Sequence, residues 1–173
     1  MNPTTPAPGT IEIALTGEPA ATPRLRFNRQ SGRTYTPDTA DDWKHAIHVA
    51  LLKTGWRKPA EPPTYPFSVR IVCYFERPKR LAKAAAGAIP KGNKPDNDNL
   101  EKAVLDQLTR SGVWRDDAQV FDLHTTKFWA AVGFAPGARI TITPHPEHEP
   151  HVSSTRKRPV RNQQPTLGAG RPG

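Results

Sequence analysis

The stretch from Phe67 to Phe75 constrains the fold more than any other part of the sequence. Apolar residues stand at every second position, so one face of the segment carries Phe67, Val69, Ile71, Cys73 and Phe75. The residues between them, Ser68, Arg70, Val72 and Tyr74, form the other face. This period of two predicts a β-strand. Because both faces carry apolar residues, we expect a central strand with a neighbour on either side.

Further strands and two helices are expected around this central strand. Alternating apolar residues predict strands at 11–15, 24–28, 120–128 and 138–143. Helical spacing predicts one helix that starts at Thr36-Pro37 and stops near Gly55. It also predicts a second helix that ends at Ser111-Gly112, with a buried stripe of Leu100, Val104, Leu105 and Leu108. These elements indicate an α+β fold, a mixed β-sheet with packed helices in a single domain.

The two ends of the chain differ in composition from the part between them. Residues 1–10 are rich in Pro and Thr and predict a disordered leader, and residues 144–173 predict a disordered, basic, Pro/Gly-rich tail. The folded domain is therefore expected at 11–143. His145, His148 and His151 recur every third residue in the expected tail, but ligand spacing without a scaffold is weak grounds for a metal site.

The charge of the chain favours a polyanionic partner. Lys and Arg number 25 against 16 Asp and Glu, which gives a formal charge of +9 and a pI near 10.1. Basic side chains that neutralise phosphates release condensed counterions, so nucleic acid is the leading partner and an anionic membrane surface the weaker one. No apolar run reaches the roughly 18 residues that span a bilayer, and no signal peptide is recognisable. We expect a soluble intracellular protein, in which the single cysteine, Cys73, is a small core residue.

A basic segment leads into the most acidic part of the sequence. Residues 77–94 hold six basic side chains and no acidic one: Arg77, Lys79, Arg80, Lys83, Lys91 and Lys94. We expect a mobile loop that grips phosphates, although a merely solvated loop is the simpler alternative. Arg24 and Arg26 on the second expected strand are further candidates for contact with the DNA backbone.

Carboxylates follow this loop at high density. Asp96 and Asp98 stand immediately before the second expected helix, and Asp116 and Asp117 lie beyond it. Such side chains are costly unless they are solvated, cap a helix or share a cation, and Mg2+ takes oxygen ligands of this kind. Residues two apart in an extended segment face the same side, so Asp96 and Asp98 can act together. Asp117 can join them only if the following strand packs beside the helix.

Helix capping is the structural alternative for several of these aspartates. Asp98 with Glu101 three residues later resembles a capping box, which leaves Asp98 balanced between a cap and a metal ligand. Aspartates at the expected start of the first helix, Asp38, Asp41 and Asp42, are explained by the positive end of the helix dipole. We do not expect these three to bind metal.

Several motifs together resemble the RusA family of Holliday junction resolvases. The segment from Lys94 to Lys102 reads Lys-Pro-Asp-Asn-Asp-Asn-Leu-Glu-Lys, and Trp114 to Val120 reads Trp-Arg-Asp-Asp-Ala-Gln-Val. Shorter matches extend the resemblance over residues 11–143: Gly17-Glu18-Pro19, Pro23 to Phe27, Gly32 to Pro37, and Phe75 to Lys79. The chain lacks the lysine that many relatives carry before the Pro23 to Phe27 segment.

The resemblance implies a RusA-like fold and a homodimeric endonuclease from a phage or prophage. Such an enzyme resolves four-way DNA junctions by paired nicks in recombination and repair, with Mg2+ as cofactor and Mn2+ as a substitute, in the cytoplasm of a bacterial host cell. By position, Asp96, Asp98 and Asp117 match the metal-binding carboxylates and Lys102 matches the active-site lysine. Asp116 matches a neighbouring acidic position and is a further candidate ligand.

Two other functions are compatible with the residues. A non-catalytic DNA-binding protein would use the carboxylates for capping and ion pairs. A nuclease could instead act on other branched DNA, such as forks or flaps. Metal-dependent nicking of a synthetic junction separates the first from the resolvase, and relative cleavage rates separate the second.

Overall fold

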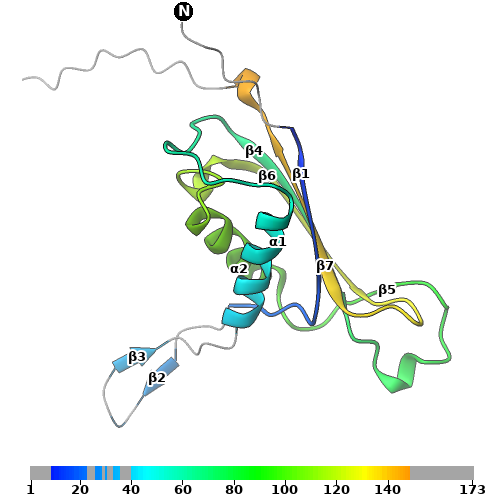
Figure 1. Cartoon of the computed structure of the whole chain (residues 1–173). Helices are drawn as coiled ribbons and strands as arrows, with labels where there is room; N and C mark the ends of the chain where they lie inside the picture. The colour runs from blue at the N-terminus through cyan, green and yellow to red at the C-terminus, as the bar shows by residue number, and fades with distance from the viewer. Residues whose placement is uncertain (1–8, 23–25, 29, 31–32, 36–39, 149–173) are drawn as a thin grey trace, which may run out of the picture.

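The expected α+β fold is confirmed by a computed structural model, which describes residues 9–22, 26–28, 30, 33–35 and 40–148. One mixed sheet carries two helices, and Figure 1 shows both helices on the same side of it. The helices are α1 (Asp41–Lys53) and α2 (Asn97–Arg110). No helix in this part of the chain is long and apolar enough to cross a membrane.

The sheet has five strands in the order β1-β7-β4-β6-β5. Their bounds are β1 (Ile11–Thr16), β4 (Phe67–Phe75), β5 (Ile89–Pro90), β6 (Val120–Trp129) and β7 (Gly137–Pro144). β4 takes the centre of the sheet, as its alternation predicted, and pairs in parallel with β6 and antiparallel with β7. The outer pairs, β1 with β7 and β5 with β6, are antiparallel.

The core lies between the sheet and the two helices. The five alternate residues of β4 that begin with Phe67 and end with Phe75 are all buried. They pack with apolar side chains of both helices, among them Trp43 and Ile47 of α1 and Leu100 and Leu108 of α2. Cys73 belongs to this core, and burial raises the pKa of its thiol to about 12. A thiol of this kind is protonated and unreactive at neutral pH.

The C-terminal end of α2 follows from local sequence. Gly112 has a φ of 74°, the left-handed conformation that glycine adopts without steric cost. Its N–H donates to the carbonyl of Thr109 at 2.9 Å, and the N–H of Val113 donates to the carbonyl of Leu108 at 3.1 Å. This pair of bonds is a Schellman motif, and the buried side chains of Val113 and Leu108 supply its usual apolar contact.

Several elements differ from the sequence-based expectation. α1 begins at Asp41, whereas Thr36, Pro37 and Asp38 lie outside the described residues. A hairpin of β2 (Arg26–Asn28) and β3 (Arg33–Tyr35) forms its own two-stranded sheet, and β3 was not predicted. The basic segment contains a short helix, η1 (Lys79–Leu81), and also β5, whose backbone pairs with β6. Ordered structure also continues past 143, through the end of β7 to η3 (Pro146–His148).

The closeness of β1 to β7 gives a test of this packing. A Cβ at Gly137 would collide with the backbone carbonyl of Leu15. We therefore expect Gly137→Ala to lower the free energy of unfolding by about 1–3 kcal/mol, measured by chemical denaturation. Gly87→Ala is the matched control, because a Cβ there meets nothing within 4 Å. Equal stability of the two variants would contradict this account of the β1–β7 pair.

Candidate active site

Asp96 and Asp98 lie at the N-terminal end of α2, which begins earlier than the sequence suggested. The helix starts at Asn97, so its N-cap is Asp96 and Asp98 falls within its first turn. The expected capping box of Asp98 with Glu101 is therefore wrong. The Asp96 side chain makes no capping hydrogen bond. In the described part of the chain the Asp98 carboxylate has no hydrogen bond or ion pair, and both aspartates are exposed to solvent.

Two lysines hold the loop that precedes these aspartates. Lys127 of β6 donates from Nζ to the carbonyl of Asn93 at 3.0 Å and to that of Pro95 at 2.6 Å. Lys91 donates to the side-chain oxygen of Asn93 at 2.8 Å and to the carbonyl of Lys94. Each lysine bonds two residues of the loop, and Lys127 thereby fixes the start of α2 relative to β6.

A third contact ties the first residue of α2 to the same strand. The Asn97 side-chain amide donates to the carbonyl of Thr125 at 3.2 Å. The sequence did not single out Lys127 for any role. Its one signal was a basic side chain near the end of an expected strand. That signal indicates no role until the position of the 91–96 loop is known.

Lys91 is buried and does not face a DNA ligand. Its side chain is only 5% exposed, and Nζ lies 4.7 Å from the centre of the Phe75 ring and 4.5 Å from that of Trp129. Burial, followed by the charge of Lys127, lowers the pKa of Lys91. The lysine is therefore an internal anchor of the loop, held by aromatic rings and carbonyl groups.

Arg77 is likewise used inside the protein. Its guanidinium donates to the carbonyls of Ala130 and Ala85, each at 2.8 Å, and also to that of Gly87. These bonds tie the basic segment to the end of β6. Of the predicted phosphate-binding residues, four are exposed: Lys79, Arg80, Lys83 and Lys94. Arg24 lies outside the described residues, and Arg26 lies in β2.

Asp116 and Asp117, which lie beyond the C-terminal end of α2, have different structural roles. Asp116 is the N-cap of η2 (Asp117–Gln119) and accepts a hydrogen bond from the backbone N–H of Ala118 at 2.8 Å. Gln119 completes a capping box by accepting from the backbone N–H of Asp116 at 3.1 Å. Asp117 is exposed, and its carboxylate makes no hydrogen bond or ion pair within the described residues. The structure thus gives Asp116 a local structural role and leaves Asp117 available.

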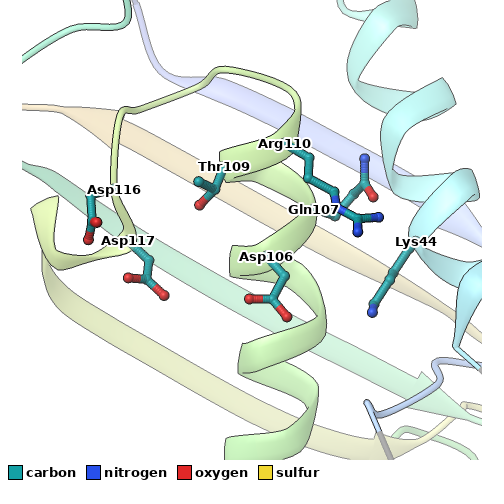
Figure 2. A pocket seen from close by; sticks show the side chains of 7 residues that line it. All are labelled: Lys44, Asp106, Gln107, Thr109, Arg110, Asp116 and Asp117. Atoms are coloured by element: carbon teal, nitrogen blue, oxygen red, sulfur yellow. The ribbon is translucent and has the colours of Figure 1, made fainter. Parts of the chain in front are cut away.

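Asp117 faces the side of α2 and not its N-terminal end. It lines an open pocket of about 360 Å³ together with Lys44, Asp106, Gln107, Thr109, Arg110 and Asp116. Figure 2 shows the carboxylates of Asp117 and Asp106 extending into the same space. Asp106 follows Asp98 by eight residues, which corresponds to about 12 Å along a helix axis.

The three predicted metal ligands do not form one compact cluster within the described part of one chain. Among the described residues, the ligand atoms of Asp96, Asp98 and Asp117 are not all within 4.8 Å of one another. The sequence analysis required the strand after α2 to pack beside the start of the helix. Only the second half of β6 does so, through Thr125 and Lys127. Asp117 precedes the beginning of that strand.

Lys102 stands between the two groups of carboxylates. It lies one turn after Asp98, is 62% exposed, and its Nζ is 3.7 Å from a carboxylate oxygen of Asp106. An exposed ion pair of this kind contributes only about 0–1 kcal/mol, so it does not prevent Lys102 from reaching a phosphate. Exposed oxygen donors, a neighbouring lysine and a surrounding basic segment together suit a metal-dependent phosphodiesterase.

Comparison with known proteins assigns the family. The sequence matches the family Endodeoxyribonuclease RusA over residues 16–143. It is 30% identical over 138 residues to the crossover junction endodeoxyribonuclease RusA of Escherichia coli (strain K12), covering 78% of this chain and 92% of the relative. The protein of that name from Shigella sonnei (strain Ss046) matches equally, and that of Enterobacteria phage 82 is 29% identical over the same length. The chain belongs to the RusA family of endodeoxyribonucleases, as its motifs indicated.

The grip of Lys127 on the loop can be tested by removing its donors. Lys127→Met leaves the Asn93 and Pro95 carbonyls without this partner and loosens the segment that carries Asp96. We expect kcat for DNA cleavage to fall by about 100-fold with little change in KM, because a small misplacement of reacting groups is enough for such a loss. Steady-state cleavage kinetics measure both quantities.

Two further variants separate positioning from general stability. Lys127→Arg keeps a donor at the same place and should recover part of the rate, whereas Lys53→Met, an exposed lysine at the end of α1, should leave it unchanged. An unaltered kcat in Lys127→Met would show that the loop does not need this lysine.

Proposed function

We infer that this RusA-family endodeoxyribonuclease resolves four-way DNA junctions. The observation that carries the proposal is the start of α2, where Asp96 and Asp98 are exposed on a segment held rigidly by Lys91 and Lys127. The named relatives are crossover junction endodeoxyribonucleases, and they match most of this chain. The strongly basic composition is what binding to several DNA arms requires.

The donor set fits a hard divalent cation. Asp96, Asp98 and Asp117 offer carboxylate oxygens, are exposed, and belong to the segments that match the family pattern. We propose that they hold Mg2+, for which Mn2+ can substitute, and that Asp116 acts through the η2 cap that orients Asp117. When bound, the ion supplies positive charge at the scissile phosphate and promotes ionisation of the attacking water.

The remaining roles fall to side chains that the fold leaves exposed. Lys102, one helical turn after Asp98, stabilises negative charge that develops on the phosphate during in-line displacement. Lys79, Arg80, Lys83 and Lys94 bind backbone phosphates of the junction arms. Arg77 and Lys91 act indirectly, because their donors hold the loop that carries these four side chains.

We propose that the active form is a homodimer. A four-way junction is cut at two symmetric places, and a two-fold dimer presents two equivalent sites in matching orientations. Closed two-fold dimers are also the commonest protein oligomers. Light scattering of the purified protein, free and bound to a junction, measures the number of chains.

Substitution of one carboxylate tests the catalytic assignment. We expect Asp98→Asn to lower kcat for cleavage of a mobile four-way junction by more than about 100-fold, because even outer partners of metal ligands are worth 10–100-fold. Binding to the junction should persist, since a carboxylate does not attract a phosphate. Paired measurements of nicking and of gel-shift affinity, with and without Mg2+, give both results.

Other aspartates serve as matched comparisons in the same assay. Asp122→Asn changes an exposed aspartate of β6 and should have no effect. Asp117→Asn should lower kcat as much as Asp98→Asn does. Asp106→Asn should lower kcat less than tenfold, because the Asp106 carboxylate is paired with Lys102 and is not among the proposed metal ligands. Full Mg2+-dependent activity in Asp98→Asn would contradict the assignment of Asp98 as a metal ligand.

Faster cleavage of forks or flaps than of four-way junctions would show that the preferred substrate is another branched DNA and not the four-way junction.

The exposed part of the basic segment makes a separate prediction. Changing Lys79, Arg80 and Lys83 together to Ala should weaken junction binding and reduce the slope of log affinity against log salt by about one for each DNA phosphate that the variant no longer neutralises. The maximal cleavage rate at saturating enzyme should be nearly unchanged. A salt slope equal to that of the wild-type protein would exclude these residues from the DNA interface.

A further inference from the structure

A compact group of metal-ligating side chains lies where β7 ends, apart from the carboxylates of α2. Among the described residues, His145, Glu147 and His148 are the one group of three such side chains whose ligand atoms all lie within 4.8 Å of one another. Nδ1 of His145 is 3.3 Å from Oε1 of Glu147, and Nδ1 of His148 is 3.2 Å from the same oxygen.

The short helix η3 explains why the two histidines face the same way. The backbone N–H of His148 donates to the carbonyl of His145 at 3.1 Å, which closes one turn of 3₁₀ helix. Side chains three residues apart eclipse one another in this conformation. Pro146 fits the turn because its fixed φ suits the first helical position. The spacing of three in the sequence has therefore gained the scaffold that an unstructured tail would lack.

His145 is held in one orientation by neighbouring strands. Its backbone N–H donates to the carbonyl of Pro66 at 2.9 Å, and its Nε2 lies 3.0 Å from the hydroxyl of Ser68 in β4. The ring of Phe121 in β6 packs against it at 5.1 Å. The contact with the Glu147 carboxylate requires Nδ1–H as the donor, so Nε2 accepts from the Ser68 hydroxyl. On metal binding the ring would change tautomer, with Nε2–H donating to Ser68 and the Nδ1 lone pair facing the ion. Metal-binding histidines are usually fixed in this way, through a hydrogen bond from the second ring nitrogen.

We propose that His145, Glu147 and His148 form a binding site for a divalent first-row transition metal ion such as Zn2+. Two imidazole nitrogens and one carboxylate oxygen suit such an ion, whereas Mg2+ prefers oxygen ligands alone. Ligand atoms about 2.1 Å from Zn2+ in a tetrahedron lie about 3.4 Å apart, close to the two separations from Glu147. Glu147 and His148 are 61% and 70% exposed, so water can complete the coordination.

The site is separate from the one that cuts DNA. Ser68 alternates with the buried Phe67 and Val69, so it projects from the face of the sheet opposite the helices. The hydrogen bond between His145 and Ser68 attaches the site to the beginning of β4, and the ion would hold His145, Glu147 and His148 together across η3.

Calorimetric titration of the full chain with Zn2+, in the presence of saturating Mg2+, tests the proposal. We expect one Zn2+ per chain. His148→Ala and Glu147→Gln should each weaken binding by more than about tenfold, and Ser68→Ala by about tenfold through loss of orientation. His148 is largely exposed, so its replacement should leave the fold intact, which circular dichroism checks. Absorption bands of bound Co2+ give a second readout that reports nitrogen ligands.

Two matched variants locate the bound ion. His124→Ala removes an exposed histidine from β6, beside Asp122 at 3.4 Å, and should keep Zn2+ binding. Asp98→Asn should also keep it, because the carboxylates of α2 are not involved. Absence of Zn2+ binding in the wild-type chain, unchanged binding in His148→Ala and Glu147→Gln, or loss of binding in Asp98→Asn would each overturn the proposal.

Discussion

The parallel pairing of β4 with β6 is the constraint on which the rest of the structure depends. Parallel neighbours cannot be joined by a tight turn, so the chain between them has to return over the sheet. Here the return consists of the basic segment, α2 and η2, and it carries every proposed catalytic residue. A helix of 14 residues is about 21 Å long. The same crossover that brings these segments onto one face therefore sets Asp98 and Asp117 at different heights along it.

Electrostatics favours a wide separation of such carboxylates. Like charges that share a small space repel, and exposed carboxylates keep their hydration when nothing replaces it. The fold avoids this cost by presenting Asp98 in the first turn of α2, where the helix dipole favours negative charge, and Asp117 on a separate turn. Lys127 and Lys91 hold the start of α2 in place, because their ammonium groups donate to carbonyls of the loop that precedes the helix.

Much of the fold could be predicted because local patterns were strong. The alternation at 67–75 placed the central strand, and Ser111-Gly112 marked the end of α2, where the Schellman motif forms. The start of α2 was misplaced, because Asp98 with Glu101 resembles a capping box, and only the backbone geometry shows that the N-cap is Asp96. Arg77 and Lys91 could not be told from exposed cations, since their carbonyl partners are formed by the folded loop itself.

The sequence by itself determined the four long strands of the main sheet and its two helices, the basic character of the protein, its family motifs and the identity of the candidate carboxylates. Each of these depends on residues close together in the chain, where periodicity and spacing are sufficient. Only the tertiary structure decided which cations are buried, that Lys127 holds the loop before Asp96, and that Ser68 orients His145 towards Glu147. These contacts join residues far apart in sequence, and strand order and register bring them together.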